Sequence, residues 1–263
     1  MTEMLSLDNP LAGFRLDDEV AAITGGGSGI GRAIAITFAR VGAAIAILDR
    51  NETAATAAAE AVRKAGGRAE IFVLDISEEA QVDRAFADLA KRMGRLDVLV
   101  NSAAIAIRKP ATELPRADWD KVMDVNVTGS FLCARAAGRL MLPRAKGSIV
   151  NLASIMGQSG GIYPNVSYQT SKGAVVNMTR ALAMEWARQG IRVNAIAPSW
   201  VKTELAMALL EKPDVRAEIE RATPMGRVAE VEEIVGAALF LASRAASMVT
   251  GHMLAVDGGY LAR

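Results

Sequence analysis

Short apolar runs of strand length alternate with segments of helical spacing along most of this 263-residue chain. The strand-length runs that we expect lie at residues 19–24, 43–48, 71–74, 96–100, 148–152, 191–196 and 253–256. Strands separated by helices of this length call for a mostly parallel sheet with helices on both faces. The sequence therefore predicts an α/β fold, a Rossmann-like doubly wound parallel sheet of about seven strands.

The helical segments fill the intervals between these runs. They lie at residues 29–42, 52–65, 78–93, 119–142, 203–221 and 231–242, and a further helix carries Tyr168 and ends at Gln189. The segment 119–142 reads as one long helix or two abutting helices, and Pro213 interrupts the segment 203–221. No linker, low-complexity segment or tandem repeat divides the chain, so we expect one domain over residues 1–263.

A glycine-rich loop, Thr24-Gly25-Gly26-Gly27-Ser28-Gly29-Ile30-Gly31, separates the first strand from the first helix. Glycine tolerates positive φ and has no Cβ, so the backbone can approach a pyrophosphate at the partly positive end of a helix. The alternative is that the glycines only form a tight turn and bind no ligand. The position between a strand and a helix, with an acidic residue at the end of the second strand, favours a dinucleotide site.

Asp49 is that acidic residue, 18 residues beyond Gly31. Its carboxylate can accept hydrogen bonds from the adenosine ribose and would repel a 2′-phosphate, which favours NAD over NADP. Arg50 acts in the opposite direction, because a guanidinium can bind that phosphate. We expect NAD, with NADP less favoured, and a solvated aspartate at a strand end as the alternative without a ligand.

Tyr168 and Lys172 lie four residues apart, so on a helix the phenol and the ammonium share one face. An ammonium about 4 Å away at an effective dielectric of about 20 contributes about 4 kcal/mol, enough to bring a phenol pKa from about 10 toward 7. The pair can then serve as general acid and base at an oxygen. Chance pairs at this spacing are common, but of the three tyrosines only Tyr168 has a lysine there.

Charge, cysteine and histidine content argue against several other classes of protein. The 30 basic and 29 acidic residues form no run suited to nucleic acid or a lipid surface, so we expect neither partner. No apolar run reaches the length of a membrane span, and residues 1–10 lack the pattern of an export signal. The single cysteine, Cys133, is consistent with the reducing cytoplasm, and the single histidine, His252, makes a metal site improbable.

With the glycine-rich loop and the Tyr168–Lys172 pair in one chain, the sequence resembles the short-chain dehydrogenase/reductase family along nearly its full length. Further landmarks of that family follow in order: Asp75-Ile76, Asn101-Ser102-Ala103-Ala104, Val125-Asn126-Val127, Ser154 and the stretch from Pro198 to Thr203. The resemblance implies reversible hydride transfer between a nicotinamide cofactor and a secondary alcohol or ketone. We expect a cofactor half at about 17–150 and a catalytic and substrate half at about 151–263. The helix from Thr203 to Arg221, interrupted by Pro213 and followed by Pro224, is a candidate lid at 203–224, with a fixed surface helix as the alternative.

The resemblance also implies roles for individual residues. Ser154 would hydrogen-bond the substrate oxygen, Tyr168 would exchange its proton, Lys172 would lower the tyrosine pKa and hold the nicotinamide ribose, and Asn126 would support a proton relay through water. The expected cofactor contacts are Gly25, Ser28, Gly29, Ile30 and Gly31 at the pyrophosphate and Asp49 at the adenosine ribose. To these the resemblance adds Asp75 and Ile76 at the adenine, Asn101 and Ala103 as backbone neighbours of the ribose, Tyr168 and Lys172, and Val201 with Thr203 at the carboxamide. Structural roles remain open for some of them: Asn101 and Asn126 as caps or backbone bridges, and Ser154 in a turn.

Two positions depart from the family's pattern. Ala104 and Ser199 stand where the family usually has glycine. A Cβ at either position restricts φ and narrows the cofactor cleft, so we expect these two loops to differ in detail from the family's pattern. Neither position carries a proton or a charge in the mechanism, so the chemistry is unaffected.

We expect the substrate to contact residues that follow Ser154 and residues in the loop after the sixth strand. These include Met156, Gln158, Ser159, Tyr163, Asn165, Ser199, Trp200 and Glu204. Such a polar set suits a polyhydroxylated substrate, because a buried polar group needs a partner. Residues 9–16 and 254–260 are similar to sugar-alcohol dehydrogenases of the family, with gluconate-type dehydrogenases as near neighbours, so we expect a polyol, sugar or sugar acid.

Two other functions remain open at this point. A 3-oxoacyl thioester reductase that uses NADPH shares every landmark above, although no basic cluster suited to an acidic carrier protein stands out. A dinucleotide-binding regulator without turnover belongs to a different class, and the complete set of Ser154, Tyr168 and Lys172 argues against it. The resemblance further implies a homotetramer formed through the long helices and the C-terminal strand.

Overall fold

A computed structural model of the protein describes residues 9–263, in which seven strands form a single parallel sheet in the order β3-β2-β1-β4-β5-β6-β7. The strands are β1 (Val20–Thr24), β2 (Ala44–Asp49), β3 (Arg68–Val73), β4 (Val98–Asn101), β5 (Gly147–Leu152), β6 (Ile191–Pro198) and β7 (Met253–Val256). Strand order reverses between β1 and β4, and in such sheets ligands bind at the carboxyl ends of the strands beside this reversal. The predicted doubly wound fold is confirmed.

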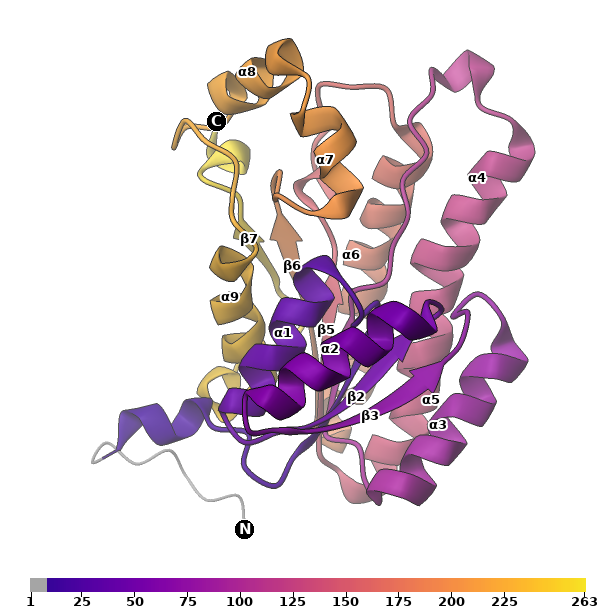
Figure 1. Ribbon diagram of the computed structural model, residues 1–263, viewed down its shortest axis with the longest axis vertical. Helices are drawn as coiled ribbons and strands as arrows, with labels where there is room; N and C mark the ends of the chain where they lie inside the picture. The colour runs from indigo at the N-terminus through magenta and orange to yellow at the C-terminus, as the bar shows by residue number, and fades with distance from the viewer. Residues whose placement is uncertain (1–8) are drawn as a thin grey trace.

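Helices cover both faces of the sheet (Figure 1). The apolar side chains of α1 (Gly29–Arg40), α2 (Glu52–Lys64) and α9 (Glu232–Ala242) are buried against one face. Those of α3 (Glu79–Met93), α5 (Ser130–Met141) and α6 (Val166–Trp186) are buried against the other. The strands are therefore buried on both sides, which explains their nearly continuous apolar sequences.

The 119–142 segment is continuously helical, as expected for one long helix or two abutting helices, but its middle is not a regular α-helix. Helix α4 (Arg116–Met123) passes through a π-helical turn, Asp124–Gly129, directly into α5. A π turn accommodates one extra residue, and such turns often occur at functional sites. Asn126 lies within this turn.

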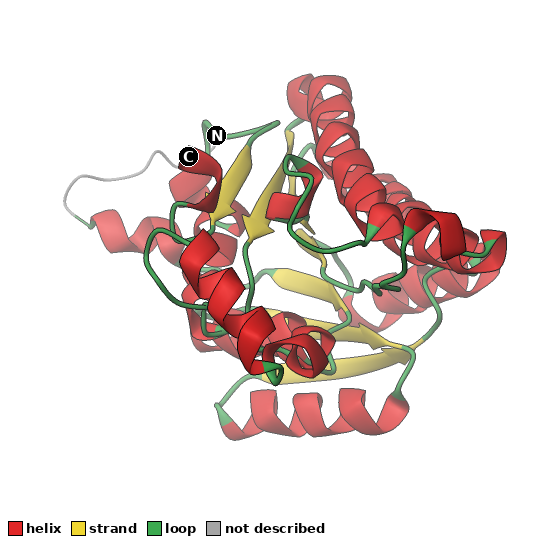
Figure 2. Ribbon diagram, turned by 90° about the horizontal axis from the view of Figure 1, so that it is seen from above, coloured by secondary structure: helices red, strands yellow, loops and turns green. Residues whose placement is uncertain are grey.

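Helices α7 (Glu204–Leu210) and α8 (Pro213–Ala222) lie above the carboxyl ends of β6 and β7 (Figures 1 and 2). The break at Pro213 is confirmed, because this proline is the first residue of α8, where no backbone N–H is needed. Strand β6 continues through Pro198, two residues beyond the predicted end. The role of residues 203–224 as a lid stays a prediction.

Two expectations concern the ends of the chain and membranes. The absence of an export signal falls mainly on residues 1–8, which lie outside the described residues. Over residues 9–263, no helix is both long enough and apolar enough to cross a bilayer.

Candidate active site

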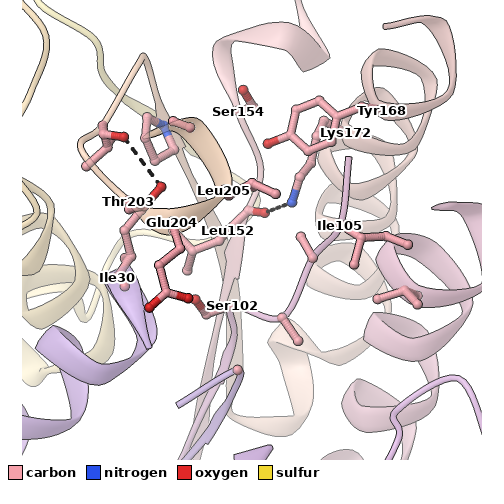
Figure 3. Close-up of a pocket in the computed structure, with 18 of the residues that line it drawn as sticks. Ile30, Ser102, Ile105, Leu152, Ser154, Tyr168, Lys172, Thr203, Glu204 and Leu205 are labelled. Carbon is pink, nitrogen blue, oxygen red and sulfur yellow. Dashed lines mark hydrogen bonds between the residues drawn. The ribbon is translucent and has the colours of Figure 1, made fainter. Parts of the chain in front are cut away.

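A cavity of about 440 Å³ opens at the carboxyl ends of the strands, beside the point where the strand order reverses. Its walls come from the glycine-rich loop, from the ends of β2, β4, β5 and β6, from the first turns of α6, and from α7. A volume of this size is typical of sites for small molecules. Segments from both halves of the chain therefore meet in one cavity (Figure 3).

The glycine-rich loop has the geometry of a tight backbone cradle. Gly25 and Gly29 have positive φ values of +63° and +48°, which side chains disfavour. A Cβ on Gly25 would lie 2.9 Å from Ala103 Cα, and a Cβ on Gly31 would lie 2.3 Å from the Gly25 carbonyl oxygen. Only glycine at these positions lets the loop fold this closely against α1 and the segment after β4.

The cradle is tied to the neighbouring strand end by Thr24. Its hydroxyl accepts hydrogen bonds from the backbone amides of Ser102 (3.0 Å) and Ala103 (3.2 Å). The start of α1, a 12-residue helix, faces the cavity through Gly29 and Ile30, and a helix N-terminus favours negative charge. These residues fit the pyrophosphate of a dinucleotide.

Asp49 lines the cavity at the end of β2, as a ribose-binding carboxylate must. Its Oδ2 accepts a hydrogen bond from the Gly27 amide (3.0 Å) and its Oδ1 accepts one from the Asn51 amide (2.9 Å). The two amides fix the carboxylate against the loop. Arg50 also lines the cavity, so the charges that favour NAD and NADP are both present.

Most other expected cofactor residues also line the cavity: Ser28, Asp75, Ile76, Ala103, Val201 and Thr203. Burial tends to raise the pKa of Asp75, but hydrogen bonds from Ser77 outweigh it and hold that pKa below its usual value. Asp75 is therefore ionised. A charged oxygen there can accept a hydrogen bond from a ligand amine.

Two expected cofactor residues do not line the cavity, and each has a structural reason. The side-chain amide of Asn101 is buried and donates to Asn151 Oδ1 (2.9 Å) and to the Ser130 carbonyl (3.2 Å). The next residue, Ser102, lines the cavity in its place. Gly31 is the third residue of α1 and packs on Gly25, so it shapes the loop and does not line the cavity.

Ser154, Tyr168 and Lys172 meet at one side of the cavity, as the spacing and the resemblance predict. In Figure 3 the phenol oxygen of Tyr168 points toward Ser154. The Lys172 ammonium lies 5.5 Å from the centre of the tyrosine ring and donates a hydrogen bond to the Leu152 carbonyl (2.6 Å). The site therefore has a hydroxyl, a phenol and an ammonium on one wall.

The electrostatics of this wall correct one expectation. Burial raises the pKa of the Tyr168 phenol above its ordinary value, and the nearby Ser154 hydroxyl and Arg108 guanidinium only partly oppose this. Burial also lowers the pKa of Lys172 to about 8. The expected lowering of the Tyr168 pKa requires a full ammonium charge directed at the phenol, but in the folded chain the Lys172 ammonium is desolvated and donates to the Leu152 carbonyl.

Asn126 is buried behind this wall. Its side chain exchanges two hydrogen bonds with the Ile105 backbone, both 2.9 Å, and donates a third to Ser171 Oγ (3.0 Å). The Ser171 hydroxyl in turn donates to the Tyr168 carbonyl (2.7 Å). The side chain thus fixes the segment after β4 against α6, and its part in a proton relay stays a prediction.

Arg108 is a cavity residue that we did not single out from the sequence. It lies in the irregular segment between β4 and α4 and is half-buried. The only available signal was its place shortly after a strand end, where ligand-binding loops occur. Nothing in its immediate neighbours distinguishes it from a surface arginine.

The far side of the cavity is formed by a separate small cluster around α7 and α8. Tyr163 and Trp200 line it and contact each other edge to face, with ring centres 6.2 Å apart. The Tyr163 hydroxyl donates to Glu218 Oε2 of α8 (2.6 Å), which ties the loop after β5 to that helix. Within residues 9–263 no three potential ligands gather into a metal site.

Comparison with known proteins agrees with this geometry. A model of the short-chain dehydrogenase/reductase type, described as Enoyl-(Acyl carrier protein) reductase, matches residues 25–261. Galactitol 2-dehydrogenase (L-tagatose-forming) of Cereibacter sphaeroides is 47% identical over 251 residues, which cover 94% of this chain and 96% of that protein. D-threitol dehydrogenase of Mycolicibacterium smegmatis is 42% identical, over 94% of each chain.

A solved structure extends the similarity to three dimensions. The gluconate 5-dehydrogenase of Burkholderia cenocepacia, in complex with NADP and tartrate, is 40% identical, with a TM-score of 0.93 over 96% of this chain and 99% of that one. Similarity of this extent covers the sheet, the loop and the catalytic wall together. The chain belongs to the short-chain dehydrogenase/reductase family, as an oxidoreductase that acts on CH–OH groups with a nicotinamide dinucleotide.

Proposed function

We propose that the protein transfers a hydride between NAD and a secondary alcohol or ketone of a polyol, sugar or sugar acid. One observation carries this proposal: Ser154, Tyr168 and Lys172 share a cavity with the glycine-rich loop. A proton donor and a dinucleotide cradle in one cavity are what alcohol oxidation requires. In this reading residues 17–150 hold the cofactor and residues 151–263 hold the substrate.

The bound nicotinamide supplies the redox chemistry by accepting or donating the hydride. The protein manages the oxygen and its proton. Ser154 holds the substrate oxygen, and Tyr168 takes the proton in oxidation and returns it in reduction. Because burial raises the pKa of Tyr168, the phenol keeps its proton in the free enzyme and is ready to act as an acid.

Oxidation needs a phenolate, and positive charge at the site stabilises that phenolate. Lys172 and Arg108 are the cations of the cavity wall on this side. Lys172 is buried, with a pKa of about 8, so it is still protonated at neutral pH. Its ammonium lies 5.5 Å from the centre of the tyrosine ring, and the family resemblance implies that it also holds the nicotinamide ribose.

Asp49 supports NAD as the preferred cofactor. Two backbone amides hold its carboxylate in place, so it cannot swing aside to admit a 2′-phosphate without losing both hydrogen bonds. Arg50 is exposed and carries no such constraint. We expect kcat/KM with NAD to exceed that with NADP, and a clear preference for NADP would contradict this assignment.

The polar lining supports a hydroxylated substrate. Side chains with hydrogen-bonding groups line the substrate side of the cavity at Ser154, Asn165, Gln169, Ser199 and Glu204. The relatives named above act, by their names, on galactitol and D-threitol, and the similar crystal structure is a gluconate 5-dehydrogenase. This supports a polyol, sugar or sugar acid as the substrate class.

Cofactor absorbance over a panel of substrates tests the proposal. The panel holds alditols, aldonates and acetoacetyl thioesters, each with NAD(H) and NADP(H). We expect turnover of alditols or aldonates. Turnover of thioesters alone would instead support the acyl reductase that the family model's description names.

We further propose a homotetramer in the cytoplasm. Phe131 on α5 and Met184 on α6 are large apolar side chains that this chain leaves exposed, on the helices through which we expect subunits to pair. Cys133 is a buried free thiol, which suits a reducing compartment. Light scattering on the purified protein measures the mass, and a monomer would contradict the tetramer.

A further inference from the structure

Arg108 lines the cavity together with Ser154, Tyr168 and Lys172, although it is not one of these catalytic residues. It belongs to the segment between β4 and α4, yet it lines the same cavity as Ser154 and Tyr168. Its positive charge is close enough to the phenol to lower the pKa of Tyr168 against the effect of burial. A group bound to Arg108 would therefore lie near the reacting oxygen.

In the described part of the chain the Arg108 guanidinium has no anionic partner. Throughout residues 9–263, no carboxylate lies within ion-pair distance of it, and its one hydrogen bond runs from Nη2 to the Leu205 carbonyl (3.3 Å). A guanidinium carries five N–H donors, so most of them are left for water or a ligand.

Other half-buried arginines of the described chain are partnered differently. Arg95 forms two hydrogen bonds with the Asp97 carboxylate, 2.6 and 2.7 Å long. Arg192 donates to three consecutive carbonyls at the end of α9. Arg108 is half-buried without comparable neutralisation, which is costly unless a ligand supplies the anion.

Glu204 is the acidic residue next to Leu205, whose carbonyl accepts the Arg108 hydrogen bond, but its carboxylate does not neutralise Arg108. Glu204, in the first turn of α7, lines the cavity, but Figure 3 shows its side chain directed away from Tyr168. The wall that holds Tyr168 and Arg108 is therefore positive. A neutral polyol would leave that charge uncompensated.

We propose that Arg108 binds the carboxylate of the substrate, so that within the function proposed above the enzyme prefers sugar acids to neutral polyols. The planar guanidinium matches a carboxylate with two parallel hydrogen bonds. Its hydrogen bond to Leu205 places this contact beside the first turn of α7. The carboxylate then fixes which hydroxyl of the chain meets Ser154 and Tyr168.

Matched substrate pairs test the assignment. D-gluconate and D-glucitol, and D-galactonate and galactitol, differ only by a carboxylate in place of a terminal CH₂OH. We would measure kcat and KM for each in the wild type, in Arg108→Gln and in Arg108→Lys. The control is Lys109→Gln, since Lys109 is the next cation along the chain but pairs with Asp118 (2.7 Å) and does not line the cavity.

We expect the wild type to favour the aldonate of each pair. In Arg108→Gln, KM for the aldonate should rise at least about tenfold, while KM for the alditol changes less than about threefold, because a hydrogen bond to a charged group is lost only with the acid. Arg108→Lys should restore part of the preference in KM for the aldonate over the alditol, and Lys109→Gln should leave the wild-type preference unchanged.

Several outcomes would overturn the assignment. If Arg108→Gln lowers kcat equally for both members of a pair and leaves both KM values alone, the arginine serves the phenol only. Selective loss with D-glucitol 6-phosphate, and not with aldonates, would assign the site to a phosphate. If the wild type turns over neither alditols nor aldonates, the proposed function itself fails. If it turns over alditols but Arg108→Gln leaves the ratio of the aldonate KM to the alditol KM unchanged, only the role of Arg108 is refuted.

Discussion

The two ends of the cavity are mounted on different parts of the molecule. At the cofactor end, the glycine-rich loop is held by backbone contacts to Ala103 and by the Thr24 hydroxyl, and it continues into the main core beneath α1. At the substrate end, α7 and α8 are held by a small separate cluster, formed by Ala206, Leu210, Ile219 and Val228.

This difference has a consequence for function. Changes at the cofactor end must disturb backbone geometry that the whole sheet shares, and packed cores tolerate such shifts poorly. Changes at the substrate end disturb a few side chains, with exposed Leu205 and Met207 beside them. The cofactor site is therefore expected to be rigid, whereas substrate preference can change with little cost in stability.

Removing the phenol that stands between the two ends gives the largest expected effect. Tyr168→Phe should lower kcat at least about a hundredfold, because the proton path to the substrate oxygen is lost. Cofactor affinity should stay within about threefold, since the glycine-rich loop and Asp49 are untouched. Steady-state kinetics and a fluorescence titration with NADH measure the two quantities. Retained turnover would refute Tyr168 as the acid and base.

A methyl group in the loop tests the rigidity of the cofactor end. Gly31→Ala places a Cβ 2.3 Å from the Gly25 carbonyl, so the backbone must move. We expect a loss of about 1–3 kcal/mol in stability and at least about tenfold weaker cofactor binding. Gly236→Ala on α9 is the matched control, because its Cβ would meet no atom within 4 Å. Equal behaviour of the two variants would show that the loop is not close-packed.

The burial of Lys172 should make the stability of the protein depend on pH. Its pKa in the folded protein is about 8, below the ordinary value, so between the two values the unfolded chain binds a proton that the folded chain lacks. Stability from this group therefore rises with pH above about 8, by up to about 1.4 kcal/mol per unit. The difference in Tm between the wild type and Lys172→Met, measured without cofactor from pH 7 to 10, should grow in favour of the wild type. A flat difference would contradict the lowered pKa.

The smallest effect is expected at the substrate end. Tyr163→Phe deletes the hydrogen bond to Glu218 and should cost about 1 kcal/mol, with KM for the substrate raised a few-fold. Because Tyr163 also lines the cavity, the effect should appear in KM and leave the Kd of NADH unchanged. Glu218→Gln keeps an acceptor and should do less. A parallel loss of NADH affinity would mean that the two ends are coupled.

Local patterns in the sequence predicted much of the fold and part of the site. Apolar runs and their spacing located all seven strands of the described chain to within a few residues. The glycine-rich loop and the Tyr168–Lys172 pair were both readable, because a turn and a helix face each involve residues that are close in sequence. Their meeting in one cavity followed from the parallel order of the strands.

Contacts between distant segments decided the rest. The cavity position of Arg108, and the replacement of Asn101 by Ser102 at the cavity wall, depend on how the segment after β4 turns, which Asn126 and Thr24 fix from elsewhere in the chain. The direction of the Tyr168 and Lys172 pKa shifts likewise depends on desolvation by neighbouring elements. Sequence alone determined which groups carry the chemistry, whereas the tertiary structure decided their charge and neighbours, because burial and long-range contacts exist only in the folded chain.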